Sequence, residues 1–389
     1  MNQLQRWSKS NSGISSEHSY PPKHSIEDIR DKCIIGIGCL DDQLVRTVSV
    51  CEFLSLQKIK EYLARYAVLA NYQLLKQRRI PQRAAMFATE ILGGDDNLTE
   101  EKFLRKTGLH LLMTVQMTLQ WLIDDTLDEK ESIDPGVTEA ISAYCISALE
   151  SGPEAAIDSS LVIQQCLDHG LPEDFIAAIS LLIGWQRELA VSFGISLAHS
   201  SIYSRFNRDF LTSFLQKNER FTDLPSYLEY RQVNCGLSME ILCGAYWLYW
   251  LENGNLPNLE DNAEYYIPLI YRYSLLGGVS NDLFGYDKDL EEGVATSVEV
   301  VKLTGLSGRS SNDEIRTANA FRLLIALHND LLKELIEQVH RCTDPLLRCI
   351  LLAALTTTWA IRMLHYEFRV IYRPGWLRKI LGAVAVGSR

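Results

Sequence analysis

The sequence lacks the patterns that mark several large classes of protein. Its nine cysteines form no CxxC pair, so we expect reduced thiols rather than a disulfide framework or a zinc site. The first residues contain no apolar core of a secretory signal, and the longest apolar patches, 33–40 and 349–355, are far too short to cross a bilayer. We therefore expect a cytoplasmic protein without a membrane span.

Motifs of several enzyme classes are also missing. The chain contains no GxxxxGK[ST] loop, no GxGxxG, no GxSxG elbow and no HExxH. A net charge of -11 argues against a partner nucleic acid, whose phosphates would require a basic face. An acidic protein can still bind a diphosphate when divalent metal ions lie between the two sets of negative charge.

What the sequence does contain is helical periodicity. Apolar residues make up 47% of the chain, enough for a sizeable core, and they recur three and four positions apart. The clear helical runs are 81–92, 99–129, 172–198, 225–250, 262–289, 312–340 and 345–372. The polar composition of segment 1–28 predicts a disordered lead-in. We expect 29–380 to form one all-α domain, a single large helical bundle. We expect 381–389 to be a C-terminal tail. No period of 30–45 residues supports the alternative, an α-solenoid.

The first acidic motif follows a helix that is apolar nearly all round, residues 111–123. It contains Asp124, Asp125 and Asp128, and the first and last of these are four positions apart, so they project from one helical face. Like charges at a helix C-terminus repel one another and oppose the helix dipole, unless cations lie between them. Mg²⁺ is bound by such carboxylate oxygens. A solvated acidic helix end is the structural alternative.

The second motif follows another long apolar helix. Asn281, Gly285 and Asp289 are spaced by four, on one stripe of a helix. An amide and a carboxylate oxygen on one stripe can hold a metal ion, and the neighbouring Lys288 can reach a phosphate as a point charge. Taken alone, this motif is equally compatible with a helix end carrying ordinary polar residues.

Together the two motifs resemble the two metal-binding sequences of class I terpene synthases, and the resemblance covers most of 29–375. It implies that the fold is the helical bundle of class I terpenoid synthases. It also implies that the cofactor is Mg²⁺, with three ions bound, and that Mn²⁺ is an alternative to Mg²⁺. The metal positions that it implies are Asp124, Asp125, Asp128, Asn281, Gly285 and Asp289. Gly285 departs from the usual hydroxyl residue, so a water would complete the coordination there, and Asp289 is one methylene shorter than the commoner glutamate.

The resemblance also implies residues that bind the substrate diphosphate. Arg231 lies fifty residues before Asn281, where the family carries its diphosphate-sensing arginine, and Gly236 follows it at an expected helix break. Lys288 and Arg369 are the other implied catalytic cations, and Tyr372 joins them as a diphosphate contact, although no Arg-Tyr dipeptide occurs there. A surface salt bridge is the structural alternative for Arg231.

The implied function is ionisation and cyclisation of a prenyl diphosphate, farnesyl diphosphate in the first instance, to a terpene hydrocarbon or alcohol. The alternatives are a diterpene synthase acting on geranylgeranyl diphosphate, a chain-elongating prenyltransferase and a non-catalytic helical scaffold. A homodimer is suggested by analogy with the fold alone. Aromatic residues are candidates for a water-excluding pocket, although core packing is the commoner role for each: Phe103, Trp121, Trp185, Phe193, Tyr246, Trp247, Tyr273, Phe284, Trp359 and Tyr366.

Overall fold

The computed structural model describes most of the chain from residue 80 onward. The described residues are 80–92, 100–128, 134–151, 159–172, 174–216, 221–291, 293–294, 296–308 and 310–365. The expected lead-in 1–28, the first part of the predicted domain and the tail 381–389 lie outside them, as do Arg369 and Tyr372.

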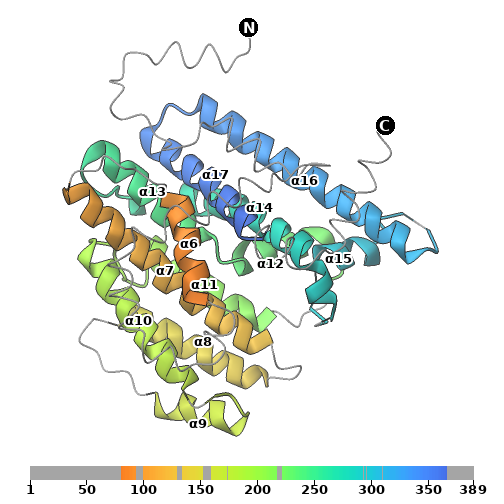
Figure 1. Cartoon of the computed structure of the whole chain (residues 1–389), viewed down its shortest axis with the longest axis horizontal. Helices are drawn as coiled ribbons and strands as arrows, with labels where there is room; N and C mark the ends of the chain where they lie inside the picture. The colour runs from red at the N-terminus through yellow and green to blue at the C-terminus, as the bar shows by residue number, and fades with distance from the viewer. Residues whose placement is uncertain are drawn as a thin grey trace.

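The described residues form α-helices joined by turns, with no strand among them, which confirms the predicted all-α class (Figure 1). Two short 3-10 helices, η2 (Phe214–Gln216) and η3 (Glu260–Asn262), join longer elements. The α-helices are α6 (Ile80–Leu92), α7 (Glu100–Asp128), α8 (Pro135–Glu150), α9 (Ser160–Asp168), α10 (Phe175–Ser192), α11 (Ile202–Ser213), α12 (Leu224–Asn234), α13 (Ser238–Asn253), α14 (Ala263–Glu291), α15 (Ser297–Leu303), α16 (Asp313–Arg341) and α17 (Pro345–His365).

Two helices form the centre of the bundle. Residues 109–120 of α7 are all buried, as the apolar run predicts for a central helix. Helix α17 is buried from Cys349 to His365 and packs against α13, α14 and α6. On α6, Ala84, Ala85 and Ala88 are buried, and these small side chains let α6 approach both α7 and α17.

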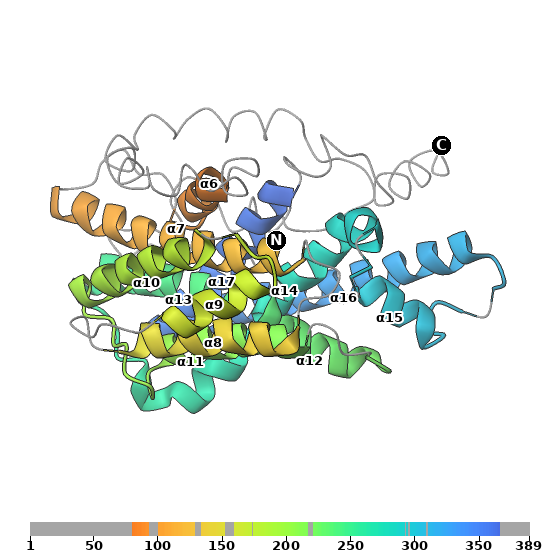
Figure 2. The ribbon, with the colours of Figure 1, turned by 90° about the horizontal axis from the view of Figure 1, so that it is seen from below.

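The outer helices surround this centre. Helix α10 packs against α7 on one side and α8 on the other, and the three run side by side in Figure 1. The view in Figure 2 shows α15 and α16 on the other side of the molecule from α10. Helices α16, α14 and α17 pack against one another there.

Local sequence signals account for several helix starts. The Asp134 carboxylate accepts a hydrogen bond from the N–H of Gly136 at the start of α8, with Pro135 in the first turn. At the start of α12, Asp223 accepts from the N–H of Ser226 in the same way. These side chains satisfy backbone donors that the helix itself leaves open.

The predicted run 225–250 is in fact two helices, α12 and α13, separated at the expected break. Gly236 has a φ of 74°, a left-handed conformation that favours glycine. A Cβ at this position would lie 3.0 Å from Oε1 of Gln120 on α7. The break is therefore required both by backbone conformation and by the close approach of α7.

Two helices, α10 and α17, are long and apolar enough to cross a membrane by length and composition. Most of the apolar window of each, 56% and 83%, is buried inside the bundle, which is the usual situation of a core helix. The cysteines that the structure describes are free thiols, in line with the absence of CxxC pairs.

Candidate active site

A pocket lies between the C-terminal part of α7, helix α12 and the second half of α14. From α7, Asp124 and Asp125 line it, and both side chains are half-buried. Asp128 is the last residue of α7, and its side chain lies outside the described part of the structure. The first predicted motif therefore contributes at least two carboxylates to the pocket.

The second motif lines the same pocket from α14. Asn281, Lys288 and Asp289 are among the lining residues, although their motif begins more than 150 positions after Asp124. Gly285 lies between them on the helix, is buried and has no side chain to offer. The folding of α7 against the rest of the bundle thus brings the two acidic motifs together.

Arg231 reaches the pocket from α12 and is fixed by a buried ion pair. Its Nε donates to Oδ1 of Asp282 over 2.8 Å, and the two side chains are 10% and 2% exposed. Oδ2 of Asp282 accepts from the Tyr227 hydroxyl at 2.9 Å and from the backbone N–H of Ser297 at 3.0 Å. One carboxylate therefore connects α12, α14 and the start of α15. The surface salt bridge considered for Arg231 is not what the structure contains.

The charge state of this group follows from its partners. Burial opposes the charge of Arg231, but the Asp282 carboxylate and smaller contributions from neighbouring groups together raise the pKa of the guanidinium well above its usual value. Burial and the same carboxylate raise the pKa of Tyr227, so the phenol remains a neutral donor. Arg231 is thus a permanent cation at the pocket.

Close packing between α12 and α14 holds this arginine in position. Nη1 of Arg231 donates to the side-chain oxygen of Asn234 over 2.8 Å, one turn further along α12. On α14, a Cβ at Gly278 would lie 3.0 Å from Cγ of Arg231 and 3.2 Å from its carbonyl oxygen. Only glycine allows the two helices to approach this closely.

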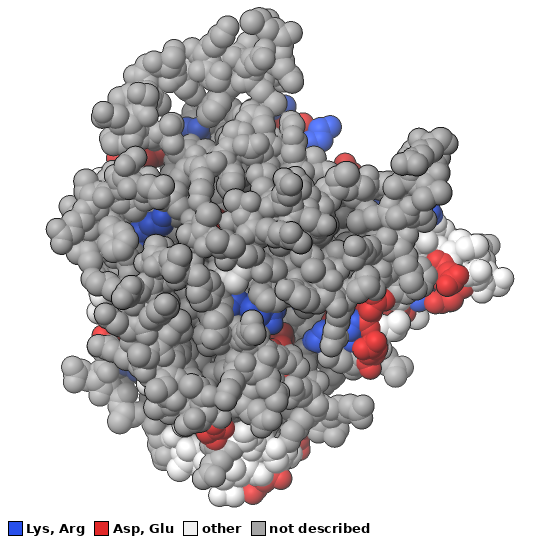
Figure 3. Space-filling model, viewed as in Figure 1, with Lys and Arg blue, Asp and Glu red and all other residues white. Residues whose placement is uncertain are grey.

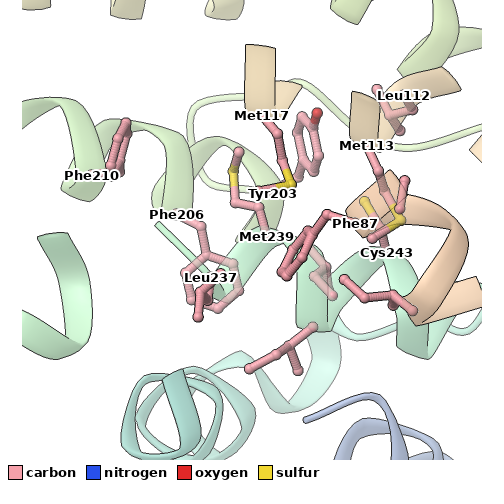
Figure 4. Close-up of a cluster of buried hydrophobic side chains, with 14 of the residues drawn as sticks. Phe87, Leu112, Met113, Met117, Tyr203, Phe206, Phe210, Leu237, Met239 and Cys243 are labelled. Atoms are coloured by element: carbon pink, nitrogen blue, oxygen red, sulfur yellow. The ribbon is translucent and has the colours of Figure 1, made fainter. Parts of the chain in front are cut away.

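The floor of the pocket is apolar and comes from the helix break. Leu237 lines the pocket and packs onto Gly277, where a Cβ would lie 1.8 Å from the Leu237 Cδ1. Met117 and Phe210 line it as well, and all three belong to the buried cluster in Figure 4. Among these groups, Gln120 donates from Nε2 to the carbonyl of Gly236 over 3.4 Å.

Two basic side chains of the pocket were not predicted from the sequence. Arg83 enters from α6, and its guanidinium lies 5.0 Å above the Trp121 ring. His365 enters from the last turn of α17, with its ring stacked on Phe284. Neither belongs to a motif, and only the packing of α6 and α17 against α7 and α14 identifies them.

Most of the predicted aromatic lining is core instead. Of the described candidates, Trp121 alone lines the pocket, together with three aromatic residues that were not predicted, Phe210, Tyr227 and Tyr230. Trp247 stacks on Trp250 and donates to the carbonyl of Leu92, whereas the indole N–H of Trp359 donates to Glu90. Helical spacing marks an aromatic residue as buried but does not tell which buried surface it faces.

The residues in the pocket suit hard divalent cations. In the described part of the chain, no three histidine, cysteine, aspartate or glutamate side chains form a cluster that could hold a metal ion alone. The pocket nevertheless offers carboxylate oxygens from α7 and an amide and a carboxylate oxygen from α14, which are the ligands of Mg²⁺. Mg²⁺ keeps several waters and substrate phosphate oxygens, so a pair of partial ligand sets fits it.

Both acidic and basic side chains line this pocket. In Figure 3, lysine or arginine and aspartate or glutamate side chains of the described residues lie next to one another near the middle of the view. A site for a metal–diphosphate complex requires both signs of charge, because the carboxylates bind the cations and the basic groups bind the anion.

The fold is that of the class I terpene synthases. A solved structure similar to this chain is 2-methylisoborneol synthase from Streptomyces coelicolor A3(2), in complex with Mg2+ and 2-fluoroneryl diphosphate. The sequences are 13% identical, the TM-score is 0.57, and the match covers 86% of this chain and 94% of that one. At this identity the likeness concerns the fold. No family model and no curated protein sequence matches the chain.

Proposed function

We propose that this chain is a magnesium-dependent terpene synthase that ionises a prenyl diphosphate and cyclises the resulting cation. The observation that carries the proposal is the single pocket shared by Asp124 and Asp125 on α7, Asn281 and Asp289 on α14, and Arg231 on α12. Two acidic motifs, far apart in sequence, converge there on a cation that the fold holds in place. Neither motif alone would distinguish such a site from an acidic helix end.

The first step breaks the carbon–oxygen bond of the substrate. The electron pair of that bond leaves with the diphosphate, and the organic fragment becomes an allylic cation. Arg231 and Lys288 donate hydrogen bonds to the departing diphosphate, and the predicted Arg369 and Tyr372 would add to them. Asp124, Asp125, Asp128, Asn281 and Asp289 would hold Mg²⁺ ions, which would supply Lewis-acid stabilisation of the same charge.

The later steps require the exclusion of water. A carbocation in contact with water would be quenched to an alcohol, so the hydrocarbon chain must fold against an apolar surface. The floor formed by Met117, Phe210 and Leu237 offers such a surface directly beside the polar end of the pocket. Loss of a proton from the cyclised cation then gives a hydrocarbon, whereas capture of one water followed by loss of a proton gives an alcohol.

The test is incubation of the purified chain with ten-, fifteen- and twenty-carbon prenyl diphosphates, with and without Mg²⁺, followed by mass analysis of the extract. We expect a cyclic terpene, with farnesyl diphosphate as the proposed substrate. Product should disappear with a chelator and in Asp124→Asn. Asp168→Asn, at the end of α9 and outside the pocket lining, is the matched control and should retain activity.

Other outcomes separate the alternatives. Turnover of the twenty-carbon substrate alone would make the chain a diterpene synthase. A longer prenyl diphosphate, formed only when isopentenyl diphosphate is added, would make it a chain-elongating enzyme. No turnover of any substrate would refute the proposal and favour a helical scaffold.

A further inference from the structure

The apolar end of the pocket lies only one to two helical turns below the acidic motifs. On α14 the lining begins at Gly277, four residues before Asn281, which corresponds to about 6 Å along the helix axis. On α7 it begins at Met117, seven residues before Asp124, which corresponds to about 10 Å. This end of the pocket is therefore shallow, and the side chain that closes it limits the length of hydrocarbon that can enter.

Leu237 reaches this end of the pocket from the break between α12 and α13. Residues before and after it in the chain are bonded to one residue of α14. Sγ of Cys235 donates to the carbonyl of Ser274 over 3.3 Å, and the hydroxyl oxygens of Ser238 and Ser274 lie 3.1 Å apart, within hydrogen-bond distance. Ser274 lies about one turn before Gly277 on α14. These bonds fix the break against α14 and place Leu237 beside Gly277.

The side chain of Leu237 packs directly onto α14. A Cβ at Gly277 would lie 1.8 Å from Cδ1 of Leu237, 3.2 Å from its Cγ and 3.8 Å from Cγ2 of Ile361. Leu237 thus occupies the space that a side chain at position 277 would fill, and it cannot move further toward this helix. Met117, which lines the same end, is unbranched and can change its rotamer when a ligand enters. Leu237 is therefore the fixed part of the apolar end.

We propose that Leu237 is the residue that sets the longest prenyl chain this pocket accepts, and that Gly277 makes room for it. The inference rests on the proposed function and names the side chain that selects the substrate. Leucine has three carbon atoms more than alanine, whereas successive prenyl diphosphates differ by five. Truncation of Leu237 therefore opens space for much of one further isoprene unit. One methylene more or less in an apolar pocket changes discrimination between substrates by about tenfold or more.

The test measures kcat/KM of the full chain in saturating Mg²⁺ for prenyl diphosphates that differ by one isoprene unit, from ten to twenty-five carbons. Leu237→Ala should raise kcat/KM for the next longer substrate, relative to the substrate that wild type prefers, by about tenfold or more. Leu324→Ala is the matched control, because Leu324 is 0% exposed and belongs to a separate core cluster outside the pocket lining. It removes the same three carbons from the core and should leave this ratio unchanged.

Gly277→Ala should change the selectivity in the opposite direction. Its Cβ would overlap Cδ1 of Leu237 and force that side chain toward the substrate. The preferred substrate should then lose kcat/KM relative to the next shorter one by about tenfold or more. In the Leu237→Ala background the added methyl group meets no Cδ1, so the effect of Gly277→Ala on this ratio should be smaller. Such coupling is expected where two side chains share one space.

Each outcome decides one question. If wild type turns over no substrate, the proposed function fails and the inference fails with it. If wild type is active and Leu237→Ala leaves the ratio unchanged, the inference is wrong while the proposed function stands. An equal shift in Leu324→Ala would also refute the inference, because a loosened core would then be the cause. If Leu237→Ala does not fold, Leu237→Val decides, and an unchanged ratio in that folded variant would refute the inference.

Discussion

Replacement of Asp282 by asparagine tests whether one buried carboxylate organises the pocket. The carboxylate accepts hydrogen bonds from Arg231, Tyr227 and the N–H of Ser297 at 2.8 to 3.0 Å, and the Asp282 side chain is 2% exposed. An asparagine has the same shape but one oxygen and no charge. Its NH₂ group would face at least one donor, and Arg231 would remain buried without its counter-charge.

The expected loss is large because the pair is buried. Removal of one partner of a buried ion pair costs about 3–5 kcal/mol, most of it from the charge left behind. Tyr227→Phe removes one neutral donor from the same carboxylate and should cost about 1 kcal/mol. The same aspartate-to-asparagine change at Asp313, whose ion pair with Lys302 involves a 62% exposed carboxylate, should cost about 0–1 kcal/mol.

The assay is urea unfolding of the three variants and wild type, together with kcat/KM on the substrate found to be turned over. We expect the order Asp282→Asn, then Tyr227→Phe, then Asp313→Asn, from the largest loss of stability to the smallest. Because Arg231 loses its fixed position, Asp282→Asn should also lower kcat/KM more than tenfold. A loss of stability under 1 kcal/mol in Asp282→Asn would refute the argument that this carboxylate holds α12 and α14 together.

Two further variants test other features. Burial raises the pKa of Glu240 from 4.5 to about 8. The folded chain therefore keeps a proton that the unfolded chain releases above pH 4.5. Because the folded state binds more protons, the free energy of unfolding should fall as the pH rises toward 8. Glu240→Gln removes this pH-dependent loss of stability. The free energy of unfolding of the variant, measured in urea, should therefore exceed that of wild type by a margin that grows by up to about 1.4 kcal/mol per pH unit. A constant difference between about pH 5 and 8 would contradict this. Gly278→Ala places a Cβ 3.0 Å from Cγ of Arg231. This close contact should lower the free energy of unfolding by about 1–3 kcal/mol and should reduce kcat/KM. Unchanged kinetics would show that α12 adjusts freely to the added methyl group.

The long helices were predictable because their apolar residues repeat with helical period. The structure has α7 at Glu100–Asp128, α14 at Ala263–Glu291 and α16 at Asp313–Arg341, each within a few residues of the predicted runs. The break after α12 was also predictable, since Gly236 stands where the backbone must turn. The apolar period and the glycine at the break are both properties of a short stretch of sequence, so they can be recognised without the rest of the fold.

The lining of the pocket was not predictable in the same way. Arg83 reaches the pocket only because α6 packs on α7 and α17 with a particular rotation, and the same holds for His365 at the end of α17. Trp359 and Trp121 look alike in sequence, yet one hydrogen-bonds Glu90 and the other lines the pocket. Rotation of a helix about its axis depends on all its neighbours, and a single sequence does not state it.

One signal in the sequence, however, connects the acidic motif to the depth of the bundle. Gln116, Gln120 and Asp124 follow one another at intervals of four along a mostly apolar part of α7, so they lie on one stripe of the helix. Gln116 donates to Glu240 on α13, Gln120 donates to the carbonyl of Gly236 at the break, and Asp124 lines the pocket.

The two glutamines explain how an acidic helix end can be held at a fixed place. A buried amide is costly unless it is hydrogen-bonded, so Gln116 fixes α7 against α13 and Gln120 fixes it against the break between α12 and α13. The same contacts fix the helix break whose Leu237 forms the floor of the pocket. Asp124 and Leu237 of the apolar floor are thus positioned relative to each other by contacts of one face of α7.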